Sequence, residues 1–171
     1  MSGENMPADN APPVLEDQAA FFRSVLGNFP SGVTAVTAMS PEGPVGFTCQ
    51  AFSSLSLDPP QVVLCVSRTS TTWPLISRIR HFCINVLAEY QQNLSDSFAR
   101  TGGEVRRRAL GLLAGRVPLL AGASAWIDCE LHAEYPGGDH VIAVADVHRL
   151  DAARDVRPLL YHRGRYTGLT P

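Results

Sequence analysis

The clearest hydrophobic pattern lies in the last third of the chain. Between residues 127 and 135, apolar residues and tyrosine alternate with acidic residues and histidine. A period of two predicts a half-buried antiparallel strand. The turn at residues 136–139 and the apolar-rich segment at 140–150 predict that this strand continues into a hairpin.

Four further segments have strand character. Residues 33–39 are mostly β-branched or small, and the turn signal at 41–44 returns the chain into residues 45–60, which predicts another hairpin. Residues 61–67 form a nearly continuous apolar run, which predicts a strand covered on both faces. Residues 81–87 also read as a strand.

Helical spacing appears in three places. Residues 15–29 predict an amphipathic opening helix, residue 73 begins a short helix with proline in its first turn, and residues 91–100 predict a third helix. Residues 104–122 fit a helix and a loop equally well. The apolar positions of the first helix are Leu15, Ala19, Phe22, Leu26 and Phe29.

Strands outnumber helices, most connections are short, and no βαβ rhythm appears. The pattern therefore predicts a mainly β fold, an antiparallel barrel with peripheral helices, rather than a doubly wound sheet. Residues 14–171 are expected to form one domain, and residues 1–13, which lack signal-peptide character, a disordered leader.

Composition and charge do not favour nucleic acid or membranes as partners. The 171 residues are 45% hydrophobic and 18% charged with a net charge of −2, which gives no reason to expect nucleic acid or an anionic membrane as a partner. The run Arg106-Arg107-Arg108 fits a solvated face better than a phosphate site. No apolar run approaches the ~20 residues of a membrane span, so we expect a cytoplasmic protein.

The four cysteines form no C-x-x-C pair that would indicate zinc or a redox dithiol. Each lies in an apolar or strand-like segment, so buried free thiols are expected and no metal site is. The cysteines are Cys49, Cys65, Cys83 and Cys129.

Residues 45–60 are unusual for a strand, because small and hydroxylated residues crowd a segment that stops at Pro59-Pro60. Small residues let a planar ligand approach the backbone, where N–H and C=O groups contact its edge. A glycine-containing edge strand entering a loop explains the same composition.

Common catalytic motifs are absent: no nucleophile elbow, H-E-x-x-H, P-loop or G-x-G-x-x-G after a strand occurs. The chemistry would then belong to an external cofactor. Three polar clusters are candidates to hold it, at residues 46–51, 67–72 and 137–140. The second cluster also fits a helix cap, and the histidine of the third also fits a surface residue.

Several motifs, in one order, resemble those of the short-chain flavin reductases, the reductase components of two-component flavin-dependent monooxygenases. The resemblance covers roughly residues 20–168. It rests on residues 22–34, 46–60, 82–87, 138–140 and 158–161. Residues 46–50 and 163–168 are more specifically similar to the reductase partners of aromatic-ring and secosteroid hydroxylases.

The resemblance implies an FMN-binding split β-barrel, usually a homodimer with flavin near the subunit interface. It also implies an NAD(P)H:flavin oxidoreductase that reduces FMN or FAD with NADH or NADPH. The reduced flavin would then reach a partner monooxygenase, by transfer or by diffusion. Two alternatives are a non-catalytic flavin- or haem-binding barrel, and an oxidase whose basic pocket would need residues 106–108.

The family's functional residues carry over by position. His140, in the Gly138-Asp139-His140 motif, would orient the nicotinamide, and no other catalytic residue is assigned. Gln50-Ala51 replaces the Asn-Ser or Ser-Ser of many members, and residues 104–116 lack the usual Phe-Gly pattern. The expected cofactor-binding residues are Gly46, Phe47, Thr48, Cys49, Gln50, Ala51, Cys65, Ser67, Arg68, Thr71, Thr72, Ser97, Phe98, His140 and Tyr166.

Overall fold

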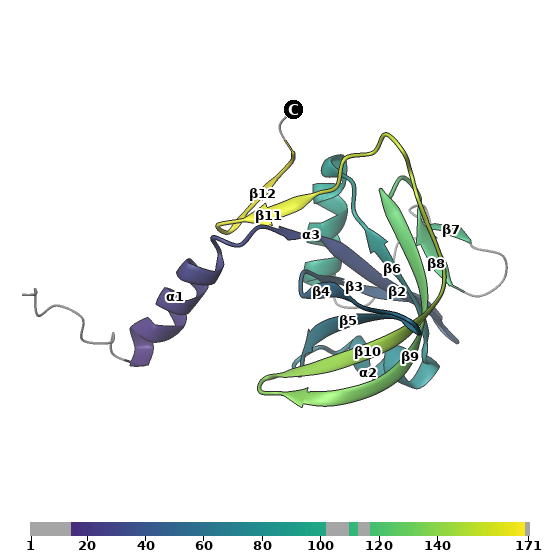
Figure 1. Ribbon diagram of the computed structural model, residues 1–171, viewed down its shortest axis with the longest axis horizontal. Coiled ribbons are helices and arrows are strands. Elements are labelled where there is room, and N and C mark those ends of the chain that lie inside the picture. The colour runs from purple at the N-terminus through teal and green to yellow at the C-terminus, as the bar shows by residue number, and fades with distance from the viewer. Residues whose placement is uncertain (1–14, 102–109, 113–116, 170–171) are drawn as a thin grey trace, which may run out of the picture.

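The computed structural model describes residues 15–101, 110–112 and 117–169 (Figure 1). Strands dominate these residues and three α-helices accompany them, as the hydrophobic pattern predicts. In chain order the elements are α1 (Leu15–Leu26), β1 (Ser31–Gly32), β2 (Thr34–Ser40), β3 (Gly43–Cys49), β4 (Phe52–Leu57), β5 (Pro60–Ser67), α2 (Trp73–Ile79), β6 (His81–Val86), the 3-10 turn η1 (Glu89–Gln91), α3 (Gln92–Thr101), β7 (Leu110–Leu112), β8 (Pro118–Leu120), β9 (Ala125–Gly137), β10 (His140–Ala152), β11 (Leu160–His162) and β12 (Arg165–Thr167).

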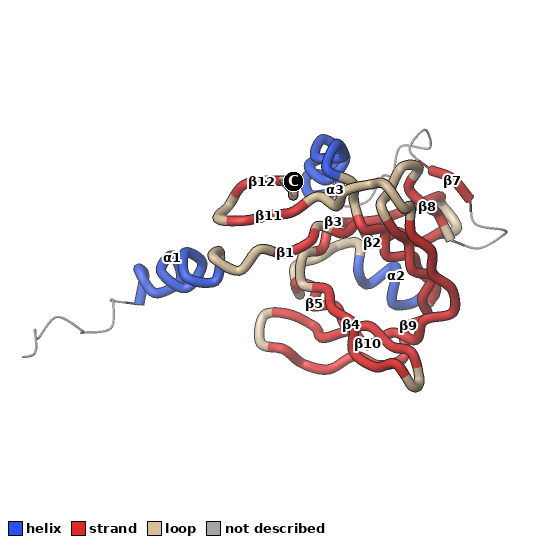
Figure 2. The backbone as a smooth tube through the Cα atoms, turned by 45° about the horizontal axis from the view of Figure 1, so that its top comes forward, coloured by secondary structure: helices blue, strands red, loops and turns tan. Residues whose placement is uncertain are grey.

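One seven-stranded antiparallel sheet, in the order β3-β2-β6-β9-β10-β5-β4, makes up the body of the protein. Its two edge strands, β3 and β4, are joined by only Gln50 and Ala51. The sheet must therefore curl until its edges meet, and Figure 2 shows it curving into a ring beside α2. At the seam, the N–H of Cys65 on β5 donates to the carbonyl of Ala51 at 2.9 Å. This seam makes the fold a split antiparallel barrel, as the resemblance implies.

The alternating segment forms the long β9–β10 hairpin, which confirms that prediction. The apolar run of β5 behaves differently from the prediction, because it is buried on one face only. Val62, Leu64 and Val66 enter the core, whereas Val63 and Cys65 lie on the wall of a cavity. A strand that is apolar on both faces thus covers the core on one side and a candidate site on the other.

The larger core surrounds Trp73 at the start of α2. Its ring meets Phe47 and Phe82 edge-on at 6.1 and 5.9 Å between centroids, and its Nε1 donates to Glu134 at 2.7 Å. Edge-to-face aromatic pairs and a satisfied indole N–H are the favourable way to bury tryptophan. The proline-containing helix predicted at residue 73 is confirmed, and it packs into the barrel core through Trp73 and Ile76.

Fully buried Asn85 fastens β8 to the barrel. Its amide nitrogen donates to Ala35 and Thr37, and its oxygen accepts from the N–H of Leu120. Residues 104–122 were expected to be helix or loop, and their described part instead holds the β7–β8 hairpin. The local pattern favoured neither alternative and did not indicate a strand, because contacts with the distant β2 and β6 position β8.

Helix α1 projects from the barrel as an arm (Figure 1), with its apolar side chains exposed. Its end is held by Arg163, whose N–H donates to Gly27 and whose guanidinium donates to Asn28. The expected leader at residues 1–13 and the basic run at 106–108 lie outside the described residues.

All four cysteines are free thiols, as expected, and three of them are buried. Burial raises the pKa of Cys49 and of Cys83 to about 12. No helix in the described part of the chain is long and apolar enough to cross a membrane.

Candidate functional site

A cavity of about 580 Å³ opens at the barrel seam, where β3 gives way to β4. Its size is within the range of small-ligand and cofactor sites. It shares wall residues with two other hollows, one of about 940 Å³ under α1 and one of about 240 Å³ at the start of α2. The wall of the central cavity consists of Phe47, Thr48, Cys49, Gln50, Ala51, Cys65, Val66, Ser67, Thr69, Ser70, Ala99, His140, Tyr161 and Tyr166.

The break between β3 and β4 supplies backbone hydrogen-bond donors to this cavity. Gln50 and Ala51 belong to neither strand, and within the described chain their N–H groups have no hydrogen-bond acceptor. Both residues are exposed and line the wall. Because backbone N–H groups seek acceptors, two free donors on a cavity wall suit a ligand whose edge carries oxygen or nitrogen acceptors.

The neighbouring side chains are less available than the sequence suggested. The hydroxyl of Thr48 donates to the carbonyl of Ser95 on α3 at 2.9 Å, so only its oxygen lone pairs remain for a ligand. The thiol of Cys49 contacts the carbonyls of Ala51 and Cys65 at 3.7 Å. With its pKa raised by burial, Cys49 is protonated at neutral pH and its role in the wall is structural.

The hydroxyl-rich loop between β5 and α2 is held in a fixed shape. Ser67 and Thr69 share a hydroxyl hydrogen bond of 2.8 Å, and the hydroxyl of Ser70 accepts from the N–H of Trp73. Arg68 is turned out of the cavity: its N–H donates to Asp139 and its Nε donates to Gly138. It ties the loop to the β9–β10 turn.

Thr71 and Thr72 line the small hollow at the start of α2, together with Thr69 and Ser70. Arg100, near the end of α3, also lines this hollow. Hydroxyl groups and a guanidinium around one hollow suit a phosphate, which accepts hydrogen bonds from both.

His140 enters the cavity wall directly opposite Ser67 in the β5–β10 register. Its Nδ1 lies 2.7 Å from the carboxylate of Asp139, and this hydrogen bond holds the pKa of Asp139 below its usual value. The ionised carboxylate can only accept a hydrogen bond here, so Nδ1–H is the donor and Nε2 is the ring nitrogen left to face a ligand.

Two tyrosines from the small β1–β11–β12 sheet close another side of the cavity. Tyr161 and Tyr166 meet edge-on at 5.2 Å, and the Tyr166 hydroxyl bonds Ser95 at 2.9 Å and Asp96 at 3.0 Å. Burial raises the pKa of Tyr166, so its phenol stays neutral. Fully buried Ser95 thus links β3, α3 and β12 behind the cavity wall.

The structure gathers most of the expected site residues around the central cavity and the small hollow beside it. Gly46, Arg68 and Ser97 are not on the walls of either: Gly46 is buried against Val36 and Phe98, and Ser97 donates to Asn93 on its own helix. Phe98 lines the small hollow while packing into the core. Sequence reasoning missed Ser95, Ala99, Arg100 and Tyr161, and of these only Tyr161 lies in a quoted motif.

The model of the flavin reductase-like domain matches residues 26–170. The chain belongs to the flavin reductase-like family. It is 45% identical over 154 residues to HsaB, the reductase subunit of a flavin-dependent monooxygenase from Rhodococcus jostii, with 88% of this chain and 77% of that protein covered.

Solved structures agree with this assignment. A homologue of nitrilotriacetate monooxygenase component B from Mycobacterium thermoresistibile superposes with a TM-score of 0.84 at 39% identity, covering 92% of this chain and 90% of that one. The NADH:FAD oxidoreductase SgcE6 of Streptomyces globisporus, in complex with NAD and FAD fragments, gives 0.83 at 31% identity, covering 94% and 98%.

Proposed function

We propose that this protein is an NAD(P)H:flavin oxidoreductase that supplies reduced FMN or FAD to a partner monooxygenase. The observation that carries the proposal is the pair of free N–H donors at Gln50 and Ala51, placed on the wall of a cavity that His140 also lines. The family to which the chain belongs supports the same conclusion.

The donor set of the central cavity and the small hollow fits a flavin. The N–H groups of Gln50 and Ala51 would hold the acceptor-rich edge of the ring, and small Cys65 and Ala99 leave room for its planar face. The hydroxyl loop and Arg100 would hold the phosphate. When bound, flavin supplies the hydride-accepting centre of the reaction, for which no protein nucleophile is needed.

His140 would position the nicotinamide. Asp139 fixes the ring through Nδ1, and the free Nε2 can accept a hydrogen bond from a carboxamide N–H. Holding two rings in a reactive arrangement removes much of the entropic barrier to transfer between them. His140 is therefore a positioning residue in this scheme rather than an acid or a base.

Steady-state assays test the function. Purified protein mixed with FMN or FAD and with NADH or NADPH should oxidise at least one nicotinamide in a flavin-dependent manner. Flavin binding without nicotinamide oxidation would instead support the non-catalytic flavin-binding alternative, and no binding of either flavin would refute both.

We further propose that the functional unit is a homodimer in which α1 packs on a second copy of this chain. Five apolar side chains of the arm and its end are about half exposed or more, which exceeds the scattered exposure of ordinary surfaces. The hollow of about 940 Å³ beneath the arm continues this apolar surface. The five residues are Phe21, Phe22, Val25, Leu26 and Phe29.

Light scattering after size-exclusion chromatography tests the dimer. The native protein should have the mass of two chains, and Phe21→Asp with Val25→Asp should shift it toward one chain. Leu150→Asp, at least as exposed but on β10, is the control and should leave the dimer intact. A monomeric native protein would contradict the proposal.

The proposal also covers the partner monooxygenase and the cellular compartment, which we propose is the cytoplasm. Reduced flavin could reach the oxygenase by diffusion, since no ligand-transfer surface is needed for that route. Four free cysteines fit the reducing cytoplasm.

A further inference from the structure

We propose that His81, Glu130 and His148 form a surface site for a divalent transition-metal ion such as Zn²⁺. One ligand atom from each residue lies within 4.8 Å of the others. The site is separate from the cavity at the seam and does not depend on the proposed function.

The geometry comes from three neighbouring strands. His81 on β6 is directly opposite Glu130 on β9 in the sheet register. Nε2 of His81 lies 3.8 Å from Oε2 of Glu130, and Nε2 of His148 lies 3.3 Å from the same oxygen. Ligand atoms around one tetrahedral zinc ion are about 3.3 Å apart, given bonds of about 2.0–2.1 Å.

A β-bulge aims the third residue at the site. The β9–β10 register passes from Val147↔Cys129 directly to Arg149↔Asp128, so His148 is the extra residue of the bulge. Bulges redirect a side chain that regular pairing would place elsewhere. Here the redirected imidazole lies against that of His81, with the ring centroids 6.1 Å apart and the planes 30° from parallel.

The surroundings leave one carboxylate oxygen free for a metal. Oε1 of Glu130 is 3.7 Å from Arg80, whereas Oε2 faces the histidines. A contact of this kind on the second oxygen orients a ligating carboxylate. The three side chains are 36–47% exposed, so a hydrated ion can reach them and water can complete the coordination.

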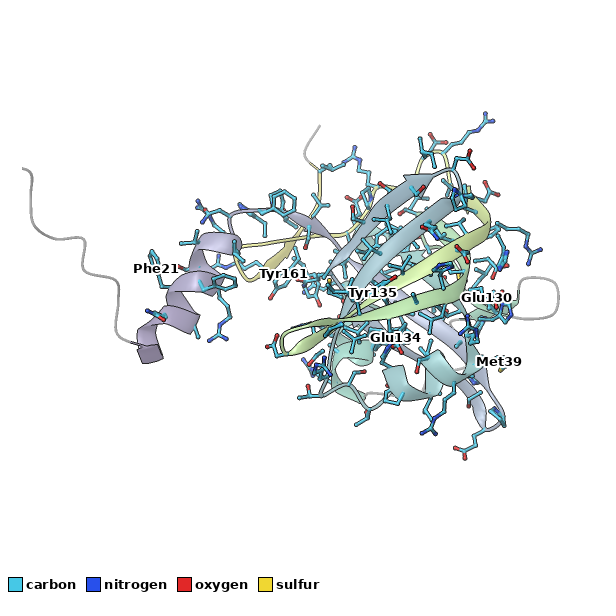
Figure 3. The ribbon with its side chains drawn as sticks, turned by 60° about the horizontal axis from the view of Figure 1, so that its bottom comes forward. Phe21, Met39, Glu130, Glu134, Tyr135 and Tyr161 are labelled. Atoms are coloured by element: carbon cyan, nitrogen blue, oxygen red, sulfur yellow. The ribbon has the colours of Figure 1, made fainter. Side chains whose placement is uncertain are left out.

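The ligand set selects the metal class. Two imidazoles and one carboxylate suit Zn²⁺, Co²⁺, Ni²⁺ or Cu²⁺, whereas Mg²⁺ and Ca²⁺ prefer oxygen ligands only. A bound ion would join β6, β9 and β10 at the start of β6, away from the cavity. Figure 3 shows Glu130 on the opposite side of the barrel from Tyr161, which lines the cavity. His148 is eight residues from His140 along β10, about 25 Å at the usual rise per residue.

The test uses full-length, tag-free protein that has been stripped with a chelator and titrated with Zn²⁺ against a chromogenic zinc indicator. We expect one zinc ion per chain. His148→Ala and the conservative Glu130→Gln should each weaken binding about tenfold or more, since even outer contacts of metal ligands are worth that much. His162→Ala, a histidine on β11 outside the cluster, is the matched control and should bind like the native protein.

A second readout is thermal stability, because an ion that binds only the folded state raises the Tm. Zinc at about 100 times the native dissociation constant should raise the native Tm by about 5–10 °C, and the same zinc concentration should raise that of His148→Ala by no more than about 3–6 °C, since a tenfold weaker site gains less. Co²⁺ should give visible absorption bands with the native protein and not with His148→Ala. The proposal is overturned if the native protein binds no zinc, or if Glu130→Gln and His148→Ala bind it as tightly as the native chain.

Discussion

A substitution at Gly46 distinguishes a packing role from a ligand-binding role for β3, the strand that precedes the seam. The resemblance places this residue at the flavin edge, whereas the structure buries it in β3, off the cavity wall. A Cβ added there would lie 2.7 Å from the carbonyl oxygen of Val36 and 2.8 Å from Cε1 of Phe98. Gly46→Ala must therefore displace either a β2 backbone group or a core aromatic ring.

Forcing one extra carbon into a packed core costs about 1–3 kcal/mol. For a domain of this length each kcal/mol lowers the Tm by about 2–4 °C, so Gly46→Ala should lower it by about 2–12 °C. Thermal unfolding followed by circular dichroism measures the change. Gly32→Ala is the matched control, since a Cβ there meets nothing within 4 Å.

Flavin affinity of the two variants, measured below their unfolding range, decides between the roles. We expect the flavin affinity of the folded Gly46→Ala protein to be within about threefold of the native affinity. The free N–H donors belong to Gln50 and Ala51, which follow Gly46 in the chain. An unchanged Tm together with a flavin affinity reduced tenfold or more would refute the packing account and support a position of Gly46 at the flavin edge.

Three other predictions concern buried and polar groups. Folding raises the pKa of Cys49 and Cys83 from 9.0 to about 12, so the protonated thiols stabilise the fold fully below pH 9 and this contribution is lost as the pH rises toward 12. The urea midpoint should fall over that range, and labelling of either thiol by iodoacetamide in the native protein at about pH 8 would contradict this burial. Asn85→Ala removes three hydrogen bonds and leaves the N–H of Leu120 without its acceptor, which should cost about 2–5 kcal/mol in urea unfolding; a loss below about 1 kcal/mol would contradict the network. His140→Ala should raise the KM for NADH more than the KM for flavin, and an unchanged KM for NADH would remove this residue from the nicotinamide site.

Local patterns predicted the elements well where the hydrophobic period is regular. The alternation in residues 127–135 became β9, and the helical spacing from Leu15 became α1, although the apolar side chains of α1 are exposed. Local pattern failed for residues 104–122, where distant contacts position β8, and for β5, where an apolar outer face borders the cavity.

The candidate site was only partly readable from the sequence. The small residues before Pro59 indicated a close backbone approach, and the free donors at Gln50 and Ala51 give that idea a physical form. Ser95 carried no signal, because a serine on a polar helix is ordinary until folding brings β3 and β12 against it. Barrel closure is a long-range event, and its contacts have no local signature.

Anaerobic rapid mixing tests the central claim most directly. The protein is mixed with one equivalent of flavin and then with NADH, and the absorbance of oxidised flavin and of NADH is followed together. We expect both to fall in a single protein-dependent phase, with one NADH consumed for each flavin reduced. Flavin that stays oxidised with NADH and also with NADPH, or that is reduced no faster than in buffer alone, would contradict the assignment of this cavity as a flavin reductase site.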